Sequence, residues 1–348
     1  MAGARTFLAR RTQPQFSWSH ARDATLRACA RRYYYRYYLS NEAKGPNPSA
    51  DAAAAASLNQ LVDLEAALGN VVHARARDLA RACRLGLPRP ALQELERRSR
   101  AELNALWVFS HCHREHAPCG PTIGRLLRDI RYGEPVEPDR LRRLSRRLSR
   151  CLAALVEDPV WNELSRLRGE TEIIAPERPE SVRAADVPLY AAPDLAYRPP
   201  KRSLGEGITP EWVIVEWKTG VGAADLEQLA LYALWLERQS FPFPKVLAPP
   251  ETAWYEAHCV GLATGHVESV RIERRDVDGV VSRIERSVHV MRELLVDSAR
   301  NLPKARTAFP PTTAAGHCRR CNFLALCDAS PLGSIAERQR QRNGRDMP

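Results

Sequence analysis

Two acids and a lysine fall close together in the second half of the 348-residue chain. Glu216 and Lys218 lie two positions apart in EWVIVEWKT, a run of β-branched and aromatic residues that predicts a strand. Side chains two apart on a strand project from the same face. Asp194 lies near the end of a preceding predicted strand that could pair with this one. Two carboxylates and an amine on one sheet face predict a site for a hard divalent cation, because Mg²⁺ and Mn²⁺ prefer oxygen ligands.

The predicted helix that follows, GAADLEQLALYALWLERQ, adds two further polar groups. Gln228 and Tyr232 are four residues apart, so they lie on one helical face. A divalent cation polarises a phosphate and activates water, and a lysine beside it can orient that water or stabilise developing charge. The amide and the phenol could then hold the scissile phosphate or the attacking water.

These motifs, in this order, resemble the PD-(D/E)XK nuclease superfamily, in particular its RecB-like exonuclease branch. The matching residues are Pro193-Asp194, Glu216-Trp217-Lys218, Gln228-x-x-x-Tyr232 and an early Gly69-x-x-x-His73. The resemblance implies that His73, Asp194 and Glu216 bind metal with the backbone carbonyl of Trp217. It also implies that Lys218 is the catalytic lysine, and that Gln228 and Tyr232 position the substrate.

A compact set of cysteines, Cys318-x-x-Cys321-x5-Cys327, lies near the C-terminus. Three thiolates leave a four-ligand metal site one ligand short. The chain is similar here to the RecB-like nucleases with an iron–sulfur cluster, which include the CRISPR-adaptation exonucleases and the AddB nuclease domain. That resemblance implies Cys29 as the fourth ligand of a [4Fe–4S] cluster that ties the N-terminal helix to the C-terminal segment. A structural Zn²⁺ on the same cysteines, or a Cys29 that is only a core residue, remain alternatives.

Two arginine-rich stretches are candidate nucleic-acid contacts. The first interleaves arginines with tyrosines in ARRYYYRYY, and the second places arginines along one face of a predicted helix. Arginine and aromatic planes can hold phosphates and unpaired bases, although tyrosines also pack cores and a basic helix face can simply be solvated. The net charge of +11 agrees with a polyanionic partner but also with an arginine-rich genome. The arginines are Arg31, Arg32, Arg36, Arg143, Arg146, Arg147 and Arg150.

The pattern along the chain predicts an α/β fold, with a small mixed sheet flanked by helices, a helical insertion and an iron–sulfur-stapled terminal subdomain. We expect a connection over 41–57, helices over about 17–39, 58–82 and 279–300, and paired strands around Thr264 and Gly265. The predicted segments are a flexible leader (1–16), N-terminal helices (17–90), the helical insertion (91–168), the nuclease core (169–300), the cysteine segment (301–332) and a disordered basic tail (333–348).

The predicted activity is phosphodiester hydrolysis of DNA with Mg²⁺ or Mn²⁺. By resemblance it acts on single-stranded ends or flaps, in repair, recombination, defence or CRISPR adaptation. The alternative is a non-catalytic DNA-binding module of a larger complex, and an RNA substrate is not separated from DNA by the sequence. No GxxxxGK[ST] loop occurs, so unwinding would need a partner helicase. No stretch reaches 18 apolar residues and no secretory signal is evident, so we expect a cytoplasmic protein with no membrane partner.

Overall fold

The structure is a computed structural model that describes residues 13–114, 125–167, 172–175, 180–199, 210–220, 222–239 and 254–333. Most of the predicted leader and of the predicted tail lies outside these ranges. Within the leader, Gln13 and Phe16 are described and are buried. The described chain divides into two compact units: a first unit of 13–61 and 287–333, and a second unit of 62–114 and 125–286.

The second unit contains a five-stranded mixed sheet in the order β3-β6-β7-β8-β9. Its strands are β3 (Ile173–Ile174), β6 (Leu195–Tyr197), β7 (Val213–Lys218), β8 (Trp254–Gly261) and β9 (His266–Glu273). β7 and β8 run parallel, and the other neighbours are antiparallel. The predicted pairing around Thr264 and Gly265 is confirmed, since β8 and β9 form a hairpin closed by Gly261 and His266. A separate hairpin joins β4 (Glu180–Ala184) and β5 (Val187–Ala191).

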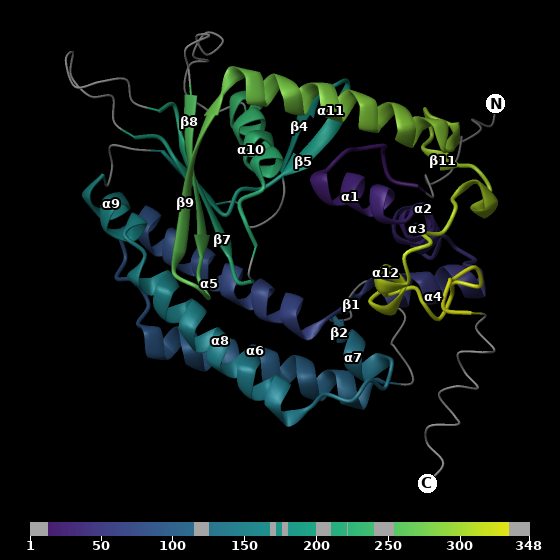
Figure 1. Cartoon of the computed structure of the whole chain (residues 1–348), viewed down its shortest axis with the longest axis horizontal. Helices are drawn as coiled ribbons and strands as arrows, with labels where there is room; N and C mark the ends of the chain where they lie inside the picture. Colours follow the sequence, from purple (N-terminus) through teal and green to yellow (C-terminus); the bar gives the residue numbers. More distant parts are fainter. Residues whose placement is uncertain are drawn as a thin grey trace, which may run out of the picture. The chain divides into compact units, whose positions relative to one another are not determined.

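Helices cover both faces of this sheet (Figure 1). Alternate residues of β7, namely Val213, Val215 and Trp217, enter a core with α5 (Leu64–Leu85), α8 (Pro138–Glu157) and α9 (Val160–Arg166). The opposite face, which carries Glu216 and Lys218, faces α10 (Leu226–Arg238). The period of two along a strand therefore separates the core residues of β7 from its polar pair.

The helical region predicted over 91–168 packs within the second unit. It contains α6 (Leu92–Cys112), β2 (Leu126–Leu127), α7 (Arg128–Arg131), α8 and α9. Leu148, Leu152 and Leu155 of α8 pack in the same core as the sheet. The helical spacing of these leucines thus marks a buried stripe, and the arginines between them lie off that stripe.

The first unit combines the N-terminal helices with the C-terminal segment. Its elements are α1 (His20–Ala28), α2 (Ala30–Tyr34), the π-helix η1 (Tyr35–Leu39), α3 (Ser40–Glu42), α4 (Ala50–Asn59), β10 (Leu295–Asp297), β11 (Leu302–Pro303), the 3-10 helix η2 (Arg306–Ala308) and α12 (Ala315–Arg319). β1 (Leu61–Val62) and α11 (Arg274–Glu293) each cross from one unit into the other.

Three sequence expectations differ from this arrangement. The helix predicted over 17–39 is interrupted at Cys29, whose backbone is extended (φ −167°, ψ 111°). Part of the predicted 41–57 connection is helix α4, because Ser49 caps a run of alanines that favour helix. The last predicted helix ends at Glu293, and the hairpin of β10 and β11 follows it. Across the described ranges, no helix is both long and apolar enough to cross a membrane.

Candidate active site and cysteine cluster

Strand pairing brings the two predicted acids together. β6 pairs with β7 with Leu195 opposite Val215, so Asp194 comes directly before the paired residues and lies beside the end of β7. The backbone N–H of Trp217 donates a hydrogen bond to Asp194 Oδ2 at 2.9 Å. The antiparallel register therefore places the Asp194 carboxylate against the strand that carries Glu216 and Lys218.

His73 reaches the same carboxylate from helix α5. Its Nδ1 lies 2.8 Å from Asp194 Oδ1. Gly69 lies one turn earlier, and a Cβ at that position would lie 3.2 Å from Thr219 Oγ1, just beyond β7. The absence of a side chain at Gly69 lets this part of α5 approach the end of the strand closely. The sequence motif that contains Gly69 and His73 thus brings the imidazole to the acids.

A continuous chain of hydrogen bonds joins the remaining predicted residues. Lys218 Nζ donates to Glu216 Oε1 at 2.7 Å and to Gln228 Oε1 at 3.0 Å. Gln228 Nε2 in turn donates to the hydroxyl of Tyr232 at 2.7 Å. Asp225 caps α10 by accepting from the backbone N–H of Gln228, which fixes the first turn of this helix. The structure therefore brings all six side chains of the predicted site together. One comes from α5, three come from β7 and the residue directly before β6, and two come from α10.

The charges of the site are strongly coupled. Burial and the neighbouring Asp194 raise the pKa of Glu216 to about 7, against the opposing effect of Lys218. Burial alone would lower the pKa of His73, but its hydrogen bond to Asp194 and the charge of that acid raise it. The pKa of Lys218 is raised because the nearby Glu216 outweighs the effect of burial. The site thus concentrates negative charge that one ammonium does not fully neutralise.

These residues fit a divalent cation. Glu216 is 6% exposed, and its Oε2 is buried with no hydrogen-bond partner among the described residues. An orphaned buried carboxylate oxygen beside a second carboxylate is costly unless a cation satisfies it. Among the residues that the structure describes, no three His, Cys, Asp or Glu side chains already have the spacing of a metal site. In the active site, hydrogen bonds to His73, Trp217 and Lys218 engage the other carboxylate oxygens.

Asp158 is a further polar residue of this region that the sequence did not single out. It is 8% exposed, and its Oδ2 accepts a hydrogen bond from the indole Nε1 of Trp217 at 2.8 Å. Its Oδ1 accepts from the backbone N–H of Val160 at 3.0 Å. The Trp217 ring also stacks on Trp161 with the ring centroids 5.3 Å apart. Trp217, between Glu216 and Lys218, is thus fixed by residues of the helical side. The only sequence signal for Asp158 was its position in an Asp-Pro-Val-Trp sequence.

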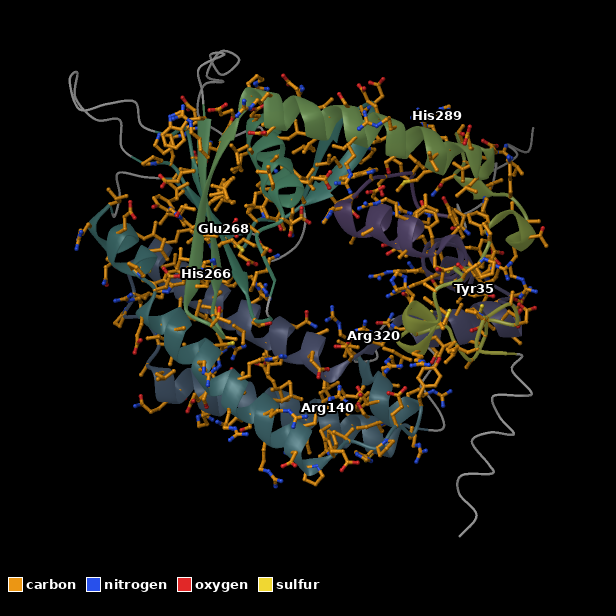
Figure 2. All side chains as sticks on the ribbon, in the orientation of Figure 1. Tyr35, Arg140, His266, Glu268, His289 and Arg320 are labelled. Carbon is orange, nitrogen blue, oxygen red and sulfur yellow. The ribbon has the colours of Figure 1, made fainter. Side chains whose placement is uncertain are left out.

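Glu268 was also missed by the sequence reasoning. It lies on β9 next to Cys259, which in turn lies next to Glu216, so these three residues cross the sheet in one row. Glu268 Oε2 accepts from the backbone N–H of Ala224 at 3.1 Å, in the segment that leads into α10 (Figure 2). Only the register of the β8–β9 hairpin identifies this residue, and the sequence does not give that register directly.

The four predicted cluster cysteines line one small cavity in the first unit: Cys29, Cys318, Cys321 and Cys327. Cys29 Sγ accepts hydrogen bonds from the backbone N–H groups of Arg32 and Thr312, each at 3.4 Å. Burial raises the pKa of the Cys321 thiol to about 11. Thiols are the ligands of iron–sulfur and zinc sites, but no three of these cysteines already have the spacing of a metal site in the described part of the chain.

The N-terminal and C-terminal segments contact each other around this cavity. Arg31 is buried, and its Nε donates to the backbone carbonyl of Phe309 at 2.9 Å. The hydroxyl of Tyr35 donates to the carbonyl of Leu326, and the Tyr35 ring lies 5.6 Å from that of Phe323. Most of the tyrosines of this stretch are buried, so they pack the unit. Arg32 lines the cysteine cavity, and Arg36 lies over the Tyr37 ring.

The second arginine group lies on α8 in the other unit. Arg143 and Arg146 are exposed, and Arg147 is half-buried. Arg150 donates to the backbone carbonyl of Ala263, in the turn between β8 and β9. Arg150 is exposed like Arg143 and Arg146, but of these three it is the one that donates a hydrogen bond to the backbone within the described ranges.

Comparison with known proteins identifies the family of the chain. The family model for the PD-(D/E)XK nuclease superfamily matches residues 17–328. Among solved structures, the crystal structure of SSO0001 is 13% identical over 58% of this chain and 93% of its own length, with a TM-score of 0.24. The search of curated proteins found no relative. The family model covers most of the chain and includes every residue of the site, and the chain belongs to the PD-(D/E)XK nuclease superfamily.

Proposed function

We propose that the protein is a metal-dependent deoxyribonuclease whose reaction takes place at Asp194, Glu216 and Lys218. The observation that carries this proposal is the hydrogen-bonded set that runs from His73 through Asp194, and from Glu216 through Lys218 to Gln228. An ordinary surface would leave such groups apart in solvent, because gathering and burying charges is costly without a function or a counter-ion.

His73, Asp194, Glu216 and the backbone carbonyl of Trp217 would hold Mg²⁺ or Mn²⁺. The bound ion supplies Lewis acidity to the scissile phosphate and lowers the pKa of a water molecule. Glu216 Oε2, which is buried and unpaired among the described residues, is the oxygen best prepared to accept it. The hydrogen bond from His73 to Asp194 fixes the carboxylate orientation before any ion binds.

Lys218 provides the positive charge for the reacting phosphate. Its Nζ is held between Glu216 and Gln228, so the ammonium has a fixed position at the end of β7. Such a preorganised donor stabilises the charge that develops on the phosphate without reorganising during the reaction. Tyr232 orients the Gln228 amide, because the Tyr232 hydroxyl accepts a hydrogen bond from Gln228 Nε2. Gln228 Oε1 then faces Lys218 and accepts from its Nζ.

The proposed substrates are single-stranded DNA ends or flaps, in repair, recombination or defence, including CRISPR adaptation. The resemblance to RecB-like exonucleases supports this choice. Arg143 and Arg146 on α8 are the proposed phosphate contacts, since both are exposed. A separate helicase is the proposed partner wherever the substrate must first be unwound.

We also propose a [4Fe–4S] cluster on Cys29, Cys318, Cys321 and Cys327. Its support is the shared cavity and the two backbone N–H groups that point at Cys29 Sγ. Hydrogen bonds of this kind to a ligand sulfur are typical of iron–sulfur sites and tune them. A cluster here would contribute its binding free energy to the folding of the first unit.

The test of the nuclease is cleavage of 5′- and 3′-labelled single-stranded DNA by anaerobically purified protein with Mn²⁺. Glu216→Gln should reduce cleavage by at least roughly 100-fold, because it removes a carboxylate needed in the transition state. The matched control is Glu285→Gln, an exposed acid on α11, which should cleave like the wild type. If folded wild type binds DNA but does not cleave it, and Glu216→Gln binds equally well, the protein is a non-catalytic binding module.

The test of the cluster is the visible spectrum and the iron and sulfide content of the same preparation. Cys318→Ser should lose the brown colour and most of the iron, whereas the exposed Cys112→Ser should keep both. A colourless wild type that contains one zinc per chain would replace the cluster with a zinc site. A preparation that contains neither metal would overturn the proposal for these cysteines.

A further inference from the structure

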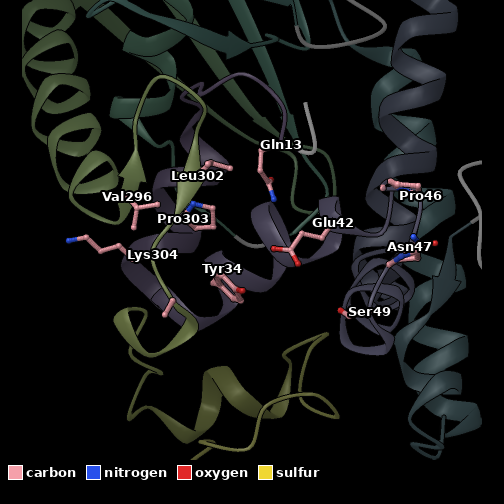
Figure 3. Close-up of a pocket in the computed structure, with 13 residues that line it drawn as sticks. Gln13, Tyr34, Glu42, Pro46, Asn47, Ser49, Val296, Leu302, Pro303 and Lys304 are labelled. Atoms are coloured by element: carbon pink, nitrogen blue, oxygen red, sulfur yellow. The ribbon is translucent and has the colours of Figure 1, made fainter. Parts of the chain in front are cut away.

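A second cavity in the first unit has no role in the proposed reaction. It has a volume of about 670 Å³ and is lined by residues from α2, α3 and the segment before α4, and by the hairpin of β10 and β11 (Figure 3). Much of its wall is apolar, with Pro46, Pro48 and Pro303 beside Leu302 and Val296. Concave sites of this size that combine apolar walls with a few polar groups are the usual form of a ligand-binding site.

The central polar group of the cavity is the carboxylate of Glu42. Within the described chain, no hydrogen bond or ion pair reaches this carboxylate. Burial raises its pKa from the ordinary value. Tyr34 lines the same cavity, and burial, followed by the charge of Glu42, raises the pKa of its hydroxyl. The cavity therefore holds a partly desolvated acid without a counter-ion beside an aromatic ring.

Gln13 adds a second acceptor without a donor. The residue is 4% exposed, and its Nε2 donates to the backbone carbonyl of Tyr38 at 3.3 Å. Its Oε1 is buried and has no partner among the described residues. A buried acceptor that lacks a donor is unfavourable, so a ligand that donates to it is favoured.

We propose that this cavity binds an aliphatic cation, an ammonium or guanidinium on an apolar stem, with Glu42 as its counter-ion. The Tyr34 ring supplies a surface that attracts cations, and the prolines supply an apolar wall for the stem. Gln13 lies on the same lining, and a shift of its buried amide would offer Oε1 as a second acceptor. A guanidinium suits the set best, because its several N–H donors can reach more than one acceptor.

The charges of the lining disfavour an anionic ligand. Among the described residues that line the cavity, Lys304 is the one lysine or arginine, and its amine points away from Glu42 in Figure 3. An anion would place its charge against the Glu42 carboxylate, which has no ion-pair partner among the described residues. Two sources could supply the favoured chemistry: an arginine or lysine side chain of a partner protein, or a small free polyamine.

Isothermal titration calorimetry of the full-length protein tests the proposal. The probes are an acetylated and amidated Gly-Arg-Gly peptide, its Gly-citrulline-Gly counterpart and spermidine. Citrulline keeps the shape of arginine and removes its charge, so this control needs no variant. We expect saturable binding of the arginine peptide that is weakened at least about 10-fold by citrulline and by Glu42→Gln, because each removes a charge-assisted hydrogen bond. Glu285→Gln should bind like the wild type.

The two sources give different results. Binding of the peptide but not spermidine identifies a protein partner, and tighter binding of spermidine identifies a free polyamine. Equal affinity for the arginine and citrulline peptides, or no saturable binding of any probe, would overturn the proposal. Glu216→Gln should bind the probes unchanged, so the result does not depend on the nuclease activity.

Discussion

Asp158 accepts a hydrogen bond from the indole of Trp217 at 2.8 Å, and it thereby links the loop between α8 and α9 to the strand that bears the active site. Trp217 lies between Glu216 and Lys218, and its own backbone N–H donates to Asp194. The position of the indole therefore affects the position of both acids.

We predict that Trp217→Phe and Asp158→Ala each lower the free energy of unfolding by about 1–3 kcal/mol, because each leaves a buried polar group without its partner. Each should also lower kcat more than it raises KM, because the acids move while the substrate contacts remain. Urea unfolding and single-turnover cleavage measure the two effects.

The double variant separates this hydrogen bond from general packing. Trp217→Phe with Asp158→Ala should cost less than the sum of the single changes by about 0.5–3 kcal/mol, since both remove the same hydrogen bond. Trp161→Phe is the matched control, because the Trp161 indole donates to the carbonyl of Leu155 and not to the Asp158 carboxylate. Strict additivity with Asp158 would show that the bond does not couple the two residues.

A second prediction concerns Glu268, which positions the segment before α10. Glu268→Ala removes the acceptor for the Ala224 N–H, and this loosens the start of the helix that holds Gln228. We expect kcat to fall roughly 10-fold, as for residues that orient a site without binding its metal. The Mn²⁺ concentration for half-maximal activity should stay unchanged, and a parallel shift in that concentration would instead make Glu268 a metal contact.

The sequence was sufficient to predict the acids, the lysine and their element types. The β-branched run of β7 and the spacing of Glu216 and Lys218 place both on one face whatever the tertiary structure. The contact of Asp194 with this strand also followed from local order, because β6 directly follows Asp194 and pairs with β7. The cysteines were located by their spacing and by the family pattern.

The supporting contacts could not be predicted because they depend on tertiary packing. Asp158 contacts Trp217 across 59 positions, and Glu268 contacts Ala224 across 44. The break at Cys29 was missed because residues on both sides of it favour helix. There the contacts of Arg31 and Cys29 with residues 309–312 accompany an extended conformation that local propensity does not indicate.

A third prediction concerns the close approach of α5 to the end of β7. Gly69→Ala adds a Cβ at 3.2 Å from Thr219 Oγ1, so Thr219 must shift by a few tenths of an ångström. Alanine favours helix by about 1 kcal/mol over glycine, so the free energy of unfolding should change little. Thr219 adjoins Lys218, so a shift of Thr219 should also displace the lysine. The rate of cleavage should therefore fall although the free energy of unfolding barely changes.

Thr219→Ala provides the rescue. The double variant Gly69→Ala with Thr219→Ala removes the crowded hydroxyl, and it should recover most of the cleavage rate while keeping the gain in helix propensity. If the double variant cleaves as slowly as Gly69→Ala alone, the shift at Thr219 is not the cause of the loss.

A fourth prediction concerns Arg140 on α8, which joins two acids of the second unit (Figure 2). Its Nη1 lies 2.6 Å from Oδ1 of Asp129, which is 1% exposed, and its Nη2 lies 2.8 Å from Oε2 of Glu65. Arg140→Met should lower the free energy of unfolding by about 3–5 kcal/mol, because it leaves a buried carboxylate unpaired. Arg142→Met is the control, since Arg142 pairs with an exposed Asp139 and should cost under about 1 kcal/mol.

The same pair predicts a pH dependence of stability. Burial would raise the pKa of Glu65, but the hydrogen bond and charge of Arg140 lower it below the ordinary 4.5. A depressed pKa means that the unfolded chain binds the proton first, so the stabilisation is complete above 4.5 and is lost as the pH falls through the lower value of the folded protein. Because Glu65 is nearly half exposed, solvent screening limits this contribution to about 1 kcal/mol or less. Urea unfolding at a series of acidic pH values should show a loss of unfolding free energy that Glu65→Gln abolishes. An equal loss in Glu65→Gln would assign the pH dependence to other acids.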